Sequence, residues 1–302
     1  MKLGPNADVS DRWDAIGRNY DDEIALAEKV MLMGRKRRKL VSQAKGEVLE
    51  VSVGTGRNMQ YYDLHLWGRA GEKEYHEGRV TSLTFNDKAG VMIDAAKKKF
   101  LELEGRKIPA QRFKGRVEFV VGDAGVTGAV EQPRGGFDTI VQTMGLCSTN
   151  DPVGLLRRLG ELCRKPTSKG MAQTGEEEAA QDRVVEGKYW KEAVKSMDKD
   201  EDYDGGRILL LEHGRGYYNW LNNILDGLAL SHADHYGCWW NRDIGAIVEK
   251  SGLEVEYMKR YHWGTTWELV LRPKMEEKVA TVPDILENKT DGLFGWMSKV
   301  LR

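Results

Sequence analysis

The stretch GEVLEVSVGTGRN, from Gly46 to Asn58, decides the fold class. Its apolar residues predict a buried strand, which breaks at Gly54 and Gly56. Glycine lacks a Cβ atom, so a strand that turns sharply on glycines leaves backbone N–H groups free to face a ligand. A strand, a glycine turn and a helix together predict a nucleotide-sized binding corner at the edge of an α/β sheet.

Apolar and β-branched runs recur along the rest of the chain and alternate with segments of helical spacing. This alternation predicts an α/β fold with a doubly wound, mostly parallel sheet. The last two runs are joined by a short glycine-containing turn and predict a hairpin, which places an antiparallel strand at or near the sheet edge. The seven expected strands are 47–53, 80–86, 117–121, 137–142, 207–212, 253–260 and 265–271.

Composition divides the chain into parts. Residues 1–45 are expected to form an N-terminal helical cap, helical from residue 11 onward, and residues 46–272 the main domain. Within that domain, the charged segment 167–204 is expected to be a mostly disordered surface insertion with one helix near residues 189–197. Residues 273–302 are expected to form an amphipathic tail that docks onto the domain, a membrane surface or a partner.

Charge and cysteine usage narrow the class of protein. With 46 Lys and Arg against 47 Asp and Glu, the chain gives no support to a strongly electrostatic nucleic-acid binder. Three separated cysteines form no disulfide framework, which indicates a reducing compartment. Neither a membrane-spanning run nor a targeting segment is visible in the sequence. The basic stretch 34–39 is interpreted as a solvated helix face, with a membrane-surface, RNA or protein contact as the alternative.

Two aspartates indicate which class of ligand the predicted binding corner accepts. The turn lacks the third glycine of G-x-G-x-x-G, and the sequence has no G-x-x-x-x-G-K-[ST] loop. The sequence therefore does not favour a ligand that contains pyrophosphate. Asp87 closes the second strand, where a carboxylate can accept both hydroxyls of a ribose, and Asp123 closes the third, where it can receive an adenine amino group. These features suit adenosine without phosphates, as in S-adenosylmethionine. The structural alternatives are a helix N-cap for Asp87 and a turn former for Asp123.

The ordered motifs VLEVSVGTGRN, VTSLTFNDKAGVMIDAAKKKF, FVVGDA and FDTIVQTMGLCSTNDP resemble those of class I S-adenosylmethionine-dependent methyltransferases. The resemblance covers about residues 11–273, apart from the insertion. Within this superfamily the chain is similar to the ubiquinone/menaquinone C-methyltransferase-like group and, through MGRKRRKL, LLLEHGRG and GTTWELV, to fungal mitochondrial methyltransferase-like proteins. The resemblance implies methyl transfer to a small-molecule acceptor and a mitochondrial location.

The resemblance also implies site roles by position. It places Glu50, Gly54 and Gly56 at the methionine moiety, Asp87 at the ribose, Lys88 and Met92 beside adenine, Asp123 and Ala124 at the adenine edge, and Gln142 and Thr143 facing the sulfonium. Tyr20, Ser52 and Asn58 complete the expected cofactor contacts. The family usually has glycine where Ser52 stands, and a serine narrows the space for the methionine carboxylate.

Segment 213–245 follows the fifth strand and is expected to form a lid over the acceptor. Its aromatic residues suit a planar apolar acceptor, such as a quinone-like ring, or a thiol. Methyl transfer needs proximity and a base, for which His213 is the first candidate and His235 the second. The alternative interpretation is that the aromatic residues of this segment pack within a helical cap and that its histidines lie on the surface. No metal is expected, because a zinc site from His232, His235 and Cys238 lacks an evident fourth ligand.

Two other functions stay open on the sequence. One is a mitochondrial assembly or mRNA-associated factor whose cofactor site is structural or vestigial, which Ser52 favours weakly. The other is an RNA or protein methyltransferase. Against RNA, the segment after the fourth strand reads TMGLC and lacks the N/D-P-P-Y/F motif for a flipped base.

Overall fold

The structure is a computed structural model, and it describes residues 7, 9, 12–13, 20–64, 79–107, 112–167 and 203–274. Residues 168–202, which hold nearly all of the expected insertion, lie outside the described residues. So do residues 275–302, which hold nearly all of the expected tail. The expectations for those two segments therefore stay predictions.

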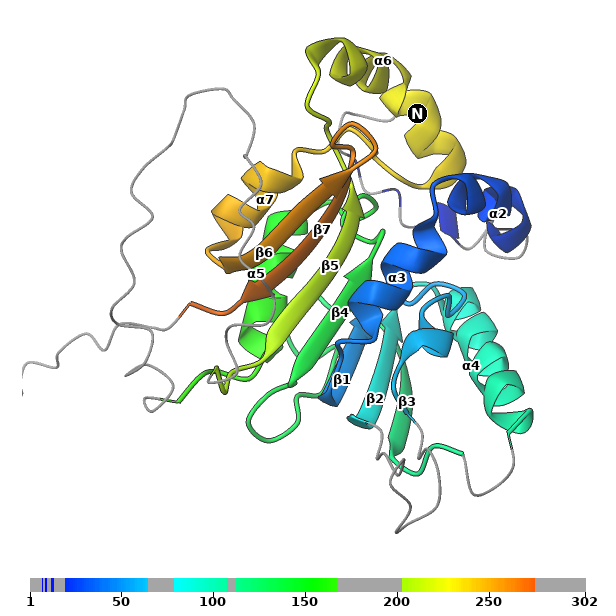
Figure 1. Cartoon of the computed structure of the whole chain (residues 1–302), viewed down its shortest axis with the longest axis vertical. Coiled ribbons are helices and arrows are strands. Elements are labelled where there is room, and N and C mark those ends of the chain that lie inside the picture. The colour runs from blue at the N-terminus through cyan, green and yellow to red at the C-terminus, as the bar shows by residue number, and fades with distance from the viewer. Residues whose placement is uncertain are drawn as a thin grey trace, which may run out of the picture.

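A seven-stranded sheet forms the centre of the molecule, in the order β3-β2-β1-β4-β5-β7-β6 (Figure 1). The first five strands pair in parallel, and β7 pairs antiparallel with both β5 and β6. The predicted doubly wound sheet with a C-terminal antiparallel pair is confirmed. The strands are β1 (Gly46–Val51), β2 (Val80–Asp87), β3 (Arg116–Val121), β4 (Thr139–Thr143), β5 (Arg207–His213), β6 (Glu254–Tyr261) and β7 (Thr266–Arg272).

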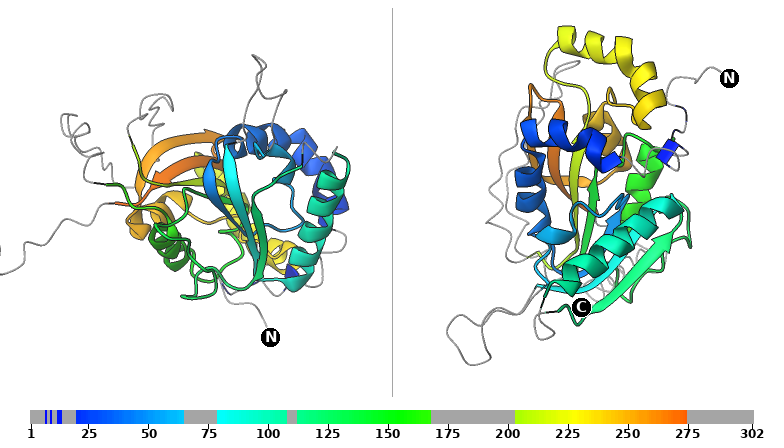
Figure 2. Two further views of the ribbon diagram at one scale, coloured as in Figure 1. Left: turned by 90° about the horizontal axis from the view of Figure 1, so that it is seen from below. Right: turned by 90° about the vertical axis from the view of Figure 1, so that its right-hand side faces the viewer.

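Helices cover both faces of the sheet (Figure 2). Helices α5 (Pro152–Leu162) and α7 (Ile244–Ser251) bury one apolar cluster, which includes Leu156 and Val248. Helices α3 (Met33–Val41) and α4 (Gly90–Gly105) bury the other. Because successive strand residues point to opposite faces, the near-continuous apolar strands serve both clusters, as expected of a parallel sheet covered on both sides.

The N-terminal region bends between two helices. Within the described residues, two helices, α2 (Tyr20–Val30) and α3, meet at Leu32. Leu32 has a φ of 52°, the left-handed conformation that a right-handed helix cannot contain.

The carboxyl ends of the parallel strands meet at one edge of the sheet, where the connecting segments gather. A short 3-10 helix, η1 (Met59–Tyr61), follows the glycine turn. Helix α6 (Asn219–Tyr236) follows β5 and projects beyond this edge (Figure 1). Among the described residues, no helix combines the length and apolar character needed to cross a membrane.

Candidate cofactor site

The glycine turn after β1 begins two residues earlier than the sequence suggests. Ser52, Gly54 and Gly56 have φ values of 54°, 56° and 80°. The strand therefore ends at Val51, because a residue at positive φ cannot continue an extended ladder. At Gly54, an added Cβ would meet no atom within 4 Å, so open space adjoins the turn.

Asp87 is bound directly to this turn. Its Oδ2 atom accepts a hydrogen bond from the Gly54 backbone N–H at 2.9 Å, and its Oδ1 atom accepts one from Ala89 N–H at 3.0 Å. A carboxylate oxygen can accept more than one hydrogen bond. The end of β2 and the turn after β1 thus form one rigid corner.

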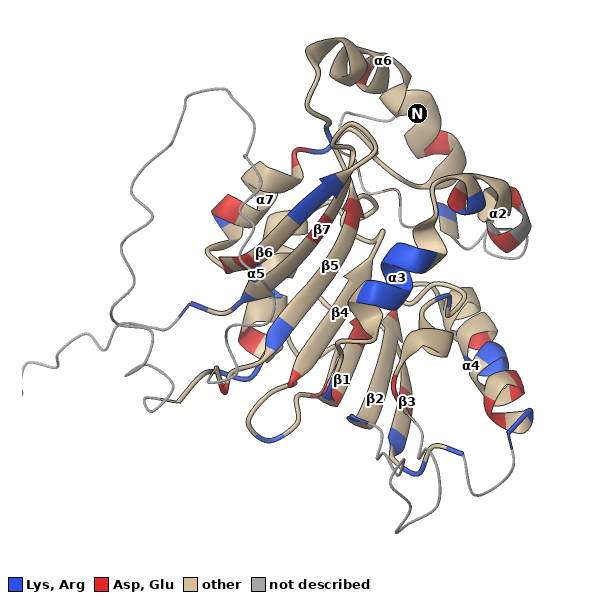
Figure 3. Cartoon of the chain, in the orientation of Figure 1, with Lys and Arg blue, Asp and Glu red and all other residues tan. Residues whose placement is uncertain are grey.

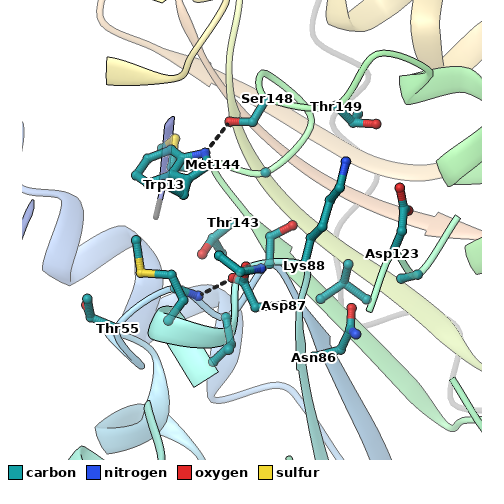
Figure 4. Close-up of a pocket in the computed structure, with 18 of the residues that line it drawn as sticks. Trp13, Thr55, Asn86, Asp87, Lys88, Asp123, Thr143, Met144, Ser148 and Thr149 are labelled. Atoms are coloured by element: carbon teal, nitrogen blue, oxygen red, sulfur yellow. Dashed lines mark hydrogen bonds between the residues drawn. The ribbon is translucent and has the colours of Figure 1, made fainter. Parts of the chain in front are cut away.

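A cavity opens at this corner, between the carboxyl ends of β1, β2, β3 and β4 (Figure 4). The structure brings many of the sequence-predicted site residues together along it. These are Ser52, Gly54, Asp87, Lys88, Met92, Asp123, Ala124 and Thr143. The sequence analysis did not select several other lining residues, namely Trp13, Arg37, Thr55, Met144, Gly145, Ser148 and Thr149.

Five predicted cofactor contacts are not among the residues that line this cavity. Glu50, Asn58 and Gln142 are buried behind it, and Gly56 faces a second cavity between α2, α3 and α4. The side chain of Tyr20 lies outside the described part of the structure.

Glu50 belongs to a buried polar network rather than to the cavity wall. Tyr62 Oη donates to its Oε2 atom at 2.6 Å, and Asn58 Nδ2 donates to its Oε1 atom at 2.9 Å. Burial raises the pKa of Glu50 to about 7, against these two hydrogen bonds and the nearby Arg37, which lower it.

Arg37 is the main site residue that the sequence analysis missed. It lies in the basic stretch 34–39, which was interpreted as a solvated face, yet its side chain is buried and lines the cavity. It donates to Thr143 Oγ1 at 2.6 Å and to Asn58 Oδ1 at 3.1 Å, and it pairs with Glu28 at 2.9 Å. A signal was available, since Met33, Arg37, Leu40 and Val41 share one helical face whose other members are apolar.

Gln142 has an unusual environment for a buried amide. The residue is fully buried, and neither its Oε1 nor its Nε2 atom has a hydrogen-bond partner within the described part of the chain. An added Cβ at Gly145 would come within 2.7 Å of Gln142 Nε2 and 2.6 Å of Ser52 Oγ. The amide therefore lies immediately behind two residues of the cavity wall, Ser52 and Gly145.

The segment after β4 is fixed by two buried charged residues. Glu212 accepts from Gly145 N–H at 3.1 Å and from Leu146 N–H at 3.2 Å, and burial raises its pKa well above the usual range. Arg242 donates to the Leu146 carbonyl oxygen at 2.6 Å. At the tip of this segment, Ser148 Oγ accepts from Trp13 Nε1 at 3.2 Å, which ties the N-terminal region to the cavity wall (Figure 4).

The two candidate bases lie elsewhere. His213 ends β5 and His235 is exposed in the last turn of α6, and neither is among the residues that line the cavity. Burial, with a contribution from His232, lowers the pKa of His213 to about 4, so this imidazole is neutral near pH 7 and a weak base. Nothing in the structure tests the catalytic roles, and the geometry gives them no support.

The described residues do not form a set of side chains that could bind a metal ion. In residues 7–274, leaving aside the gaps that the structure does not describe, no three His, Cys, Asp or Glu side chains are grouped to hold a metal ion. His232 is one of the three residues considered above for a zinc site. Its Nδ1 atom lies at hydrogen-bond distance, 2.8 Å, from the Cys238 carbonyl oxygen, and its ring stacks on Trp240 with the ring centroids 3.9 Å apart.

Comparison with solved structures identifies the fold. A methyltransferase from Haloferax volcanii, solved in complex with the Trm112 methyltransferase activator, superposes with a TM-score of 0.50 at 13% identity. The match covers 89% of this chain and 99% of the other. The chain has a Rossmann-like methyltransferase fold. No protein-family model matches the sequence.

Sequence comparison adds a relative of known class. The chain is 33% identical over 285 residues to the mitochondrial methyltransferase OMS1 of Saccharomyces cerevisiae. This confirms the likeness to fungal mitochondrial methyltransferases that the motifs predicted. The match takes in 91% of this chain but 48% of the relative, so the chain spans about half the length of the curated protein it matches.

Proposed function

We propose that this chain binds S-adenosylmethionine in the cavity at the ends of β1 to β4 and transfers its methyl group to a small-molecule acceptor. The proposal depends chiefly on the direct bond between Gly54 N–H and the Asp87 carboxylate. This bond fixes the glycine turn and the ribose-type acid as one unit, with Asp123, Ala124 and Thr143 along the same cavity. The similarity to a mitochondrial methyltransferase supports both the activity and a mitochondrial location.

The residues present fit this cofactor. Asp87 offers two acceptor oxygens to vicinal hydroxyls, and Asp123 offers a carboxylate at the neighbouring strand end. When bound, S-adenosylmethionine supplies an electrophilic methyl group, and the chain's part is to hold it and exclude water.

Arg37 and Thr143 complete the proposed site on the side away from Asp123. The guanidinium is held by three acceptors, one of them Glu28 of α2, so its orientation is fixed before any ligand arrives. A fixed, buried cation of this kind suits a carboxylate, such as that of the methionine moiety, or an anionic acceptor. We infer that the segment 213–245 and the N-terminal helices enclose the acceptor, whose identity the site does not specify.

The backbone at Ser52 favours a second candidate, a methyltransferase-like factor without catalysis. Ser52 holds a φ of 54° where the family usually has glycine, and its Oγ atom projects toward Gly145 across the cavity wall. A non-glycine residue in this conformation costs of order 1 kcal/mol, and the side chain occupies space beside the turn.

The deciding experiment is calorimetric titration of the chain with S-adenosylmethionine and S-adenosylhomocysteine. We expect micromolar binding that Asp87→Asn weakens by about tenfold or more, because a charge-assisted hydrogen bond contributes ~1.5–3 kcal/mol. Asp94→Asn is the matched control, since it makes the same change at an exposed position of α4. Melting curves of both variants check folding. Absence of binding to either ligand by the unaltered chain would refute the proposal and favour the non-catalytic factor.

A further inference from the structure

A large apolar surface lies at the carboxyl edge of the sheet and is used by none of the contacts described above. Its side chains are between 49% and 74% exposed, which is unusual for residues of this size and type. We define the apolar patch as Val30 and Leu32 at the α2–α3 junction, Trp263 in the β6–β7 turn, and Tyr218, Trp220, Ile224 and Leu228 at and along the start of α6.

Ring contacts show that the α6 and hairpin parts of the patch are continuous. The ring centroids of Tyr218 and Trp220 lie 6.3 Å apart, and those of Trp220 and Trp263 lie 6.1 Å apart. The Tyr217 N–H donates to the Trp263 carbonyl oxygen at 2.9 Å, which fixes the start of α6 against the turn. Along α6, Trp220, Ile224 and Leu228 recur every four residues and so form one stripe.

The α2–α3 junction adjoins the same turn. Lys36 Nζ donates to the Met31 carbonyl oxygen at 2.8 Å and lies 4.8 Å from the centroid of the Tyr261 ring. Leu32 and the hairpin tip are therefore neighbours, although they are more than two hundred positions apart in the chain. Figures 1 and 2 show α2, α6 and the β6–β7 turn at this one end of the molecule.

Strained backbone holds the patch outward at two points. Leu32 and Trp263 have φ values of 52° and 56°, both in the left-handed region that bulky residues avoid. Trp263 is nevertheless 65% exposed. A strained conformation that exposes a tryptophan is stable only where the surrounding structure imposes it, and such positions concentrate at functional sites.

Cations border the apolar patch. Lys36 and Lys259 both lie over the Tyr261 ring just below the turn, with Lys259 Nζ 5.4 Å from its centroid. Figure 3 shows this basic character along α3 and at the end of β6. The acid Asp226 on α6 is already paired with Arg215 at 2.8 Å. Protein surfaces at a membrane–water interface are rich in tryptophan, tyrosine and lysine. There the aliphatic part of lysine lies along apolar groups, and its ammonium group reaches the lipid headgroups.

We propose that the apolar patch rests in the headgroup region of an anionic phospholipid bilayer, with Trp220 and Trp263 as anchors and Lys36 and Lys259 meeting lipid phosphates. A bilayer fits better than a protein partner, because lysines border the exposed aromatics, while the nearby acids Glu28 of α2 and Asp226 of α6 are already paired with arginines. This docking does not depend on the proposed cofactor site.

The test is flotation of the full chain with vesicles of phosphatidylcholine, with and without phosphatidylglycerol. We expect flotation with the anionic vesicles that falls as salt is added, since the cationic contribution is screened. Trp220→Gln together with Trp263→Asn should reduce binding by about tenfold or more, because it removes two indoles that docking would bury in the bilayer. Asparagine is chosen at position 263 because it tolerates positive φ.

Leu101→Gln is the matched control, because Leu101 is 61% exposed on α4, a helix that contributes nothing to the patch, and we expect it to bind normally. Quenching of tryptophan fluorescence by brominated phospholipid in the unaltered chain needs no variant and checks insertion directly. The proposal is overturned if the unaltered chain floats with neither vesicle type, or if the double variant binds as tightly. The first of these results would direct attention to a protein partner instead.

Discussion

Glu50 shows how one residue in the decisive stretch acquires a role that its neighbours in sequence do not reveal. It lies within a buried strand, and Tyr62 and Asn58 hold its two oxygens at 2.6 and 2.9 Å. Because burial raises its pKa to about 7, this carboxyl keeps its proton in the native state well above the ordinary value of 4.5. Glu50 therefore acts behind the cavity, on the structure of its wall.

The pH dependence of stability should reveal this proton. Between about pH 4.5 and 7 the unfolded chain has lost it while the native chain retains it, so unfolding releases a proton and stability falls as pH rises. The contribution amounts to roughly 3 kcal/mol across this window. Glu50→Gln removes the titration, so we expect the free energy of unfolding of this variant to rise relative to that of the unaltered chain between about pH 4.5 and about pH 7.

Denaturant unfolding of both chains at several pH values measures this difference. Parallel curves across the window would show that Glu50 titrates normally and that the network around it does not hold a proton.

At the scale of elements, helix α7 illustrates how local chemistry and packing combine. Asp243 is its N-cap, and the side chain accepts from the Ala246 N–H at 3.0 Å. The helix then buries Ile244 and Val248 against the core cluster under α5. Gly252, with a φ of 77°, ends the helix in the left-handed conformation usual after a helix C-terminus.

We expect Asp243→Ala to destabilise the protein by about 1 kcal/mol, because an N–H of the first turn loses its acceptor. Glu249→Ala is the control, since it removes an exposed acid from the body of the same helix and should change stability by less than about 0.5 kcal/mol. Thermal or denaturant unfolding compares the two. Equal losses of stability in the two variants would mean that Asp243 contributes nothing as an N-cap beyond its charge.

At the scale of the whole molecule, an ion pair joins helix α3 to the antiparallel end of the sheet. Lys39 of α3 lies 3.1 Å from Glu268 of β7, whose side chain is fully buried. Tyr261 Oη also donates to Glu268, at 2.5 Å. The packing of α3 on this sheet face thus depends on partners separated by 229 positions.

Lys39→Met should destabilise the protein by roughly 1–3 kcal/mol, because it leaves a buried carboxylate without its cation. The value lies below that of a fully buried pair, since Lys39 is half exposed and partly screened. Arg38→Met, one position earlier and exposed, should cost little. Combining Lys39→Met with Glu268→Gln should recover much of the loss, and simple additivity of the two changes in unfolding experiments would argue against the pair.

The sequence by itself determined the seven strands, their parallel order with a terminal antiparallel pair, and the glycine turn with Asp87 and Asp123 at strand ends. These features follow from local periodicity and from the rule that parallel strands share a carboxyl edge. Only the tertiary structure decided that Arg37 is buried in the cavity, that His213 and His235 lie away from its wall, and that Leu32 joins Trp263 in one exposed surface. Such outcomes depend on which distant segments pack together. The apolar face of α3 indicates that Arg37 is buried, but it does not indicate which cavity its side chain lines.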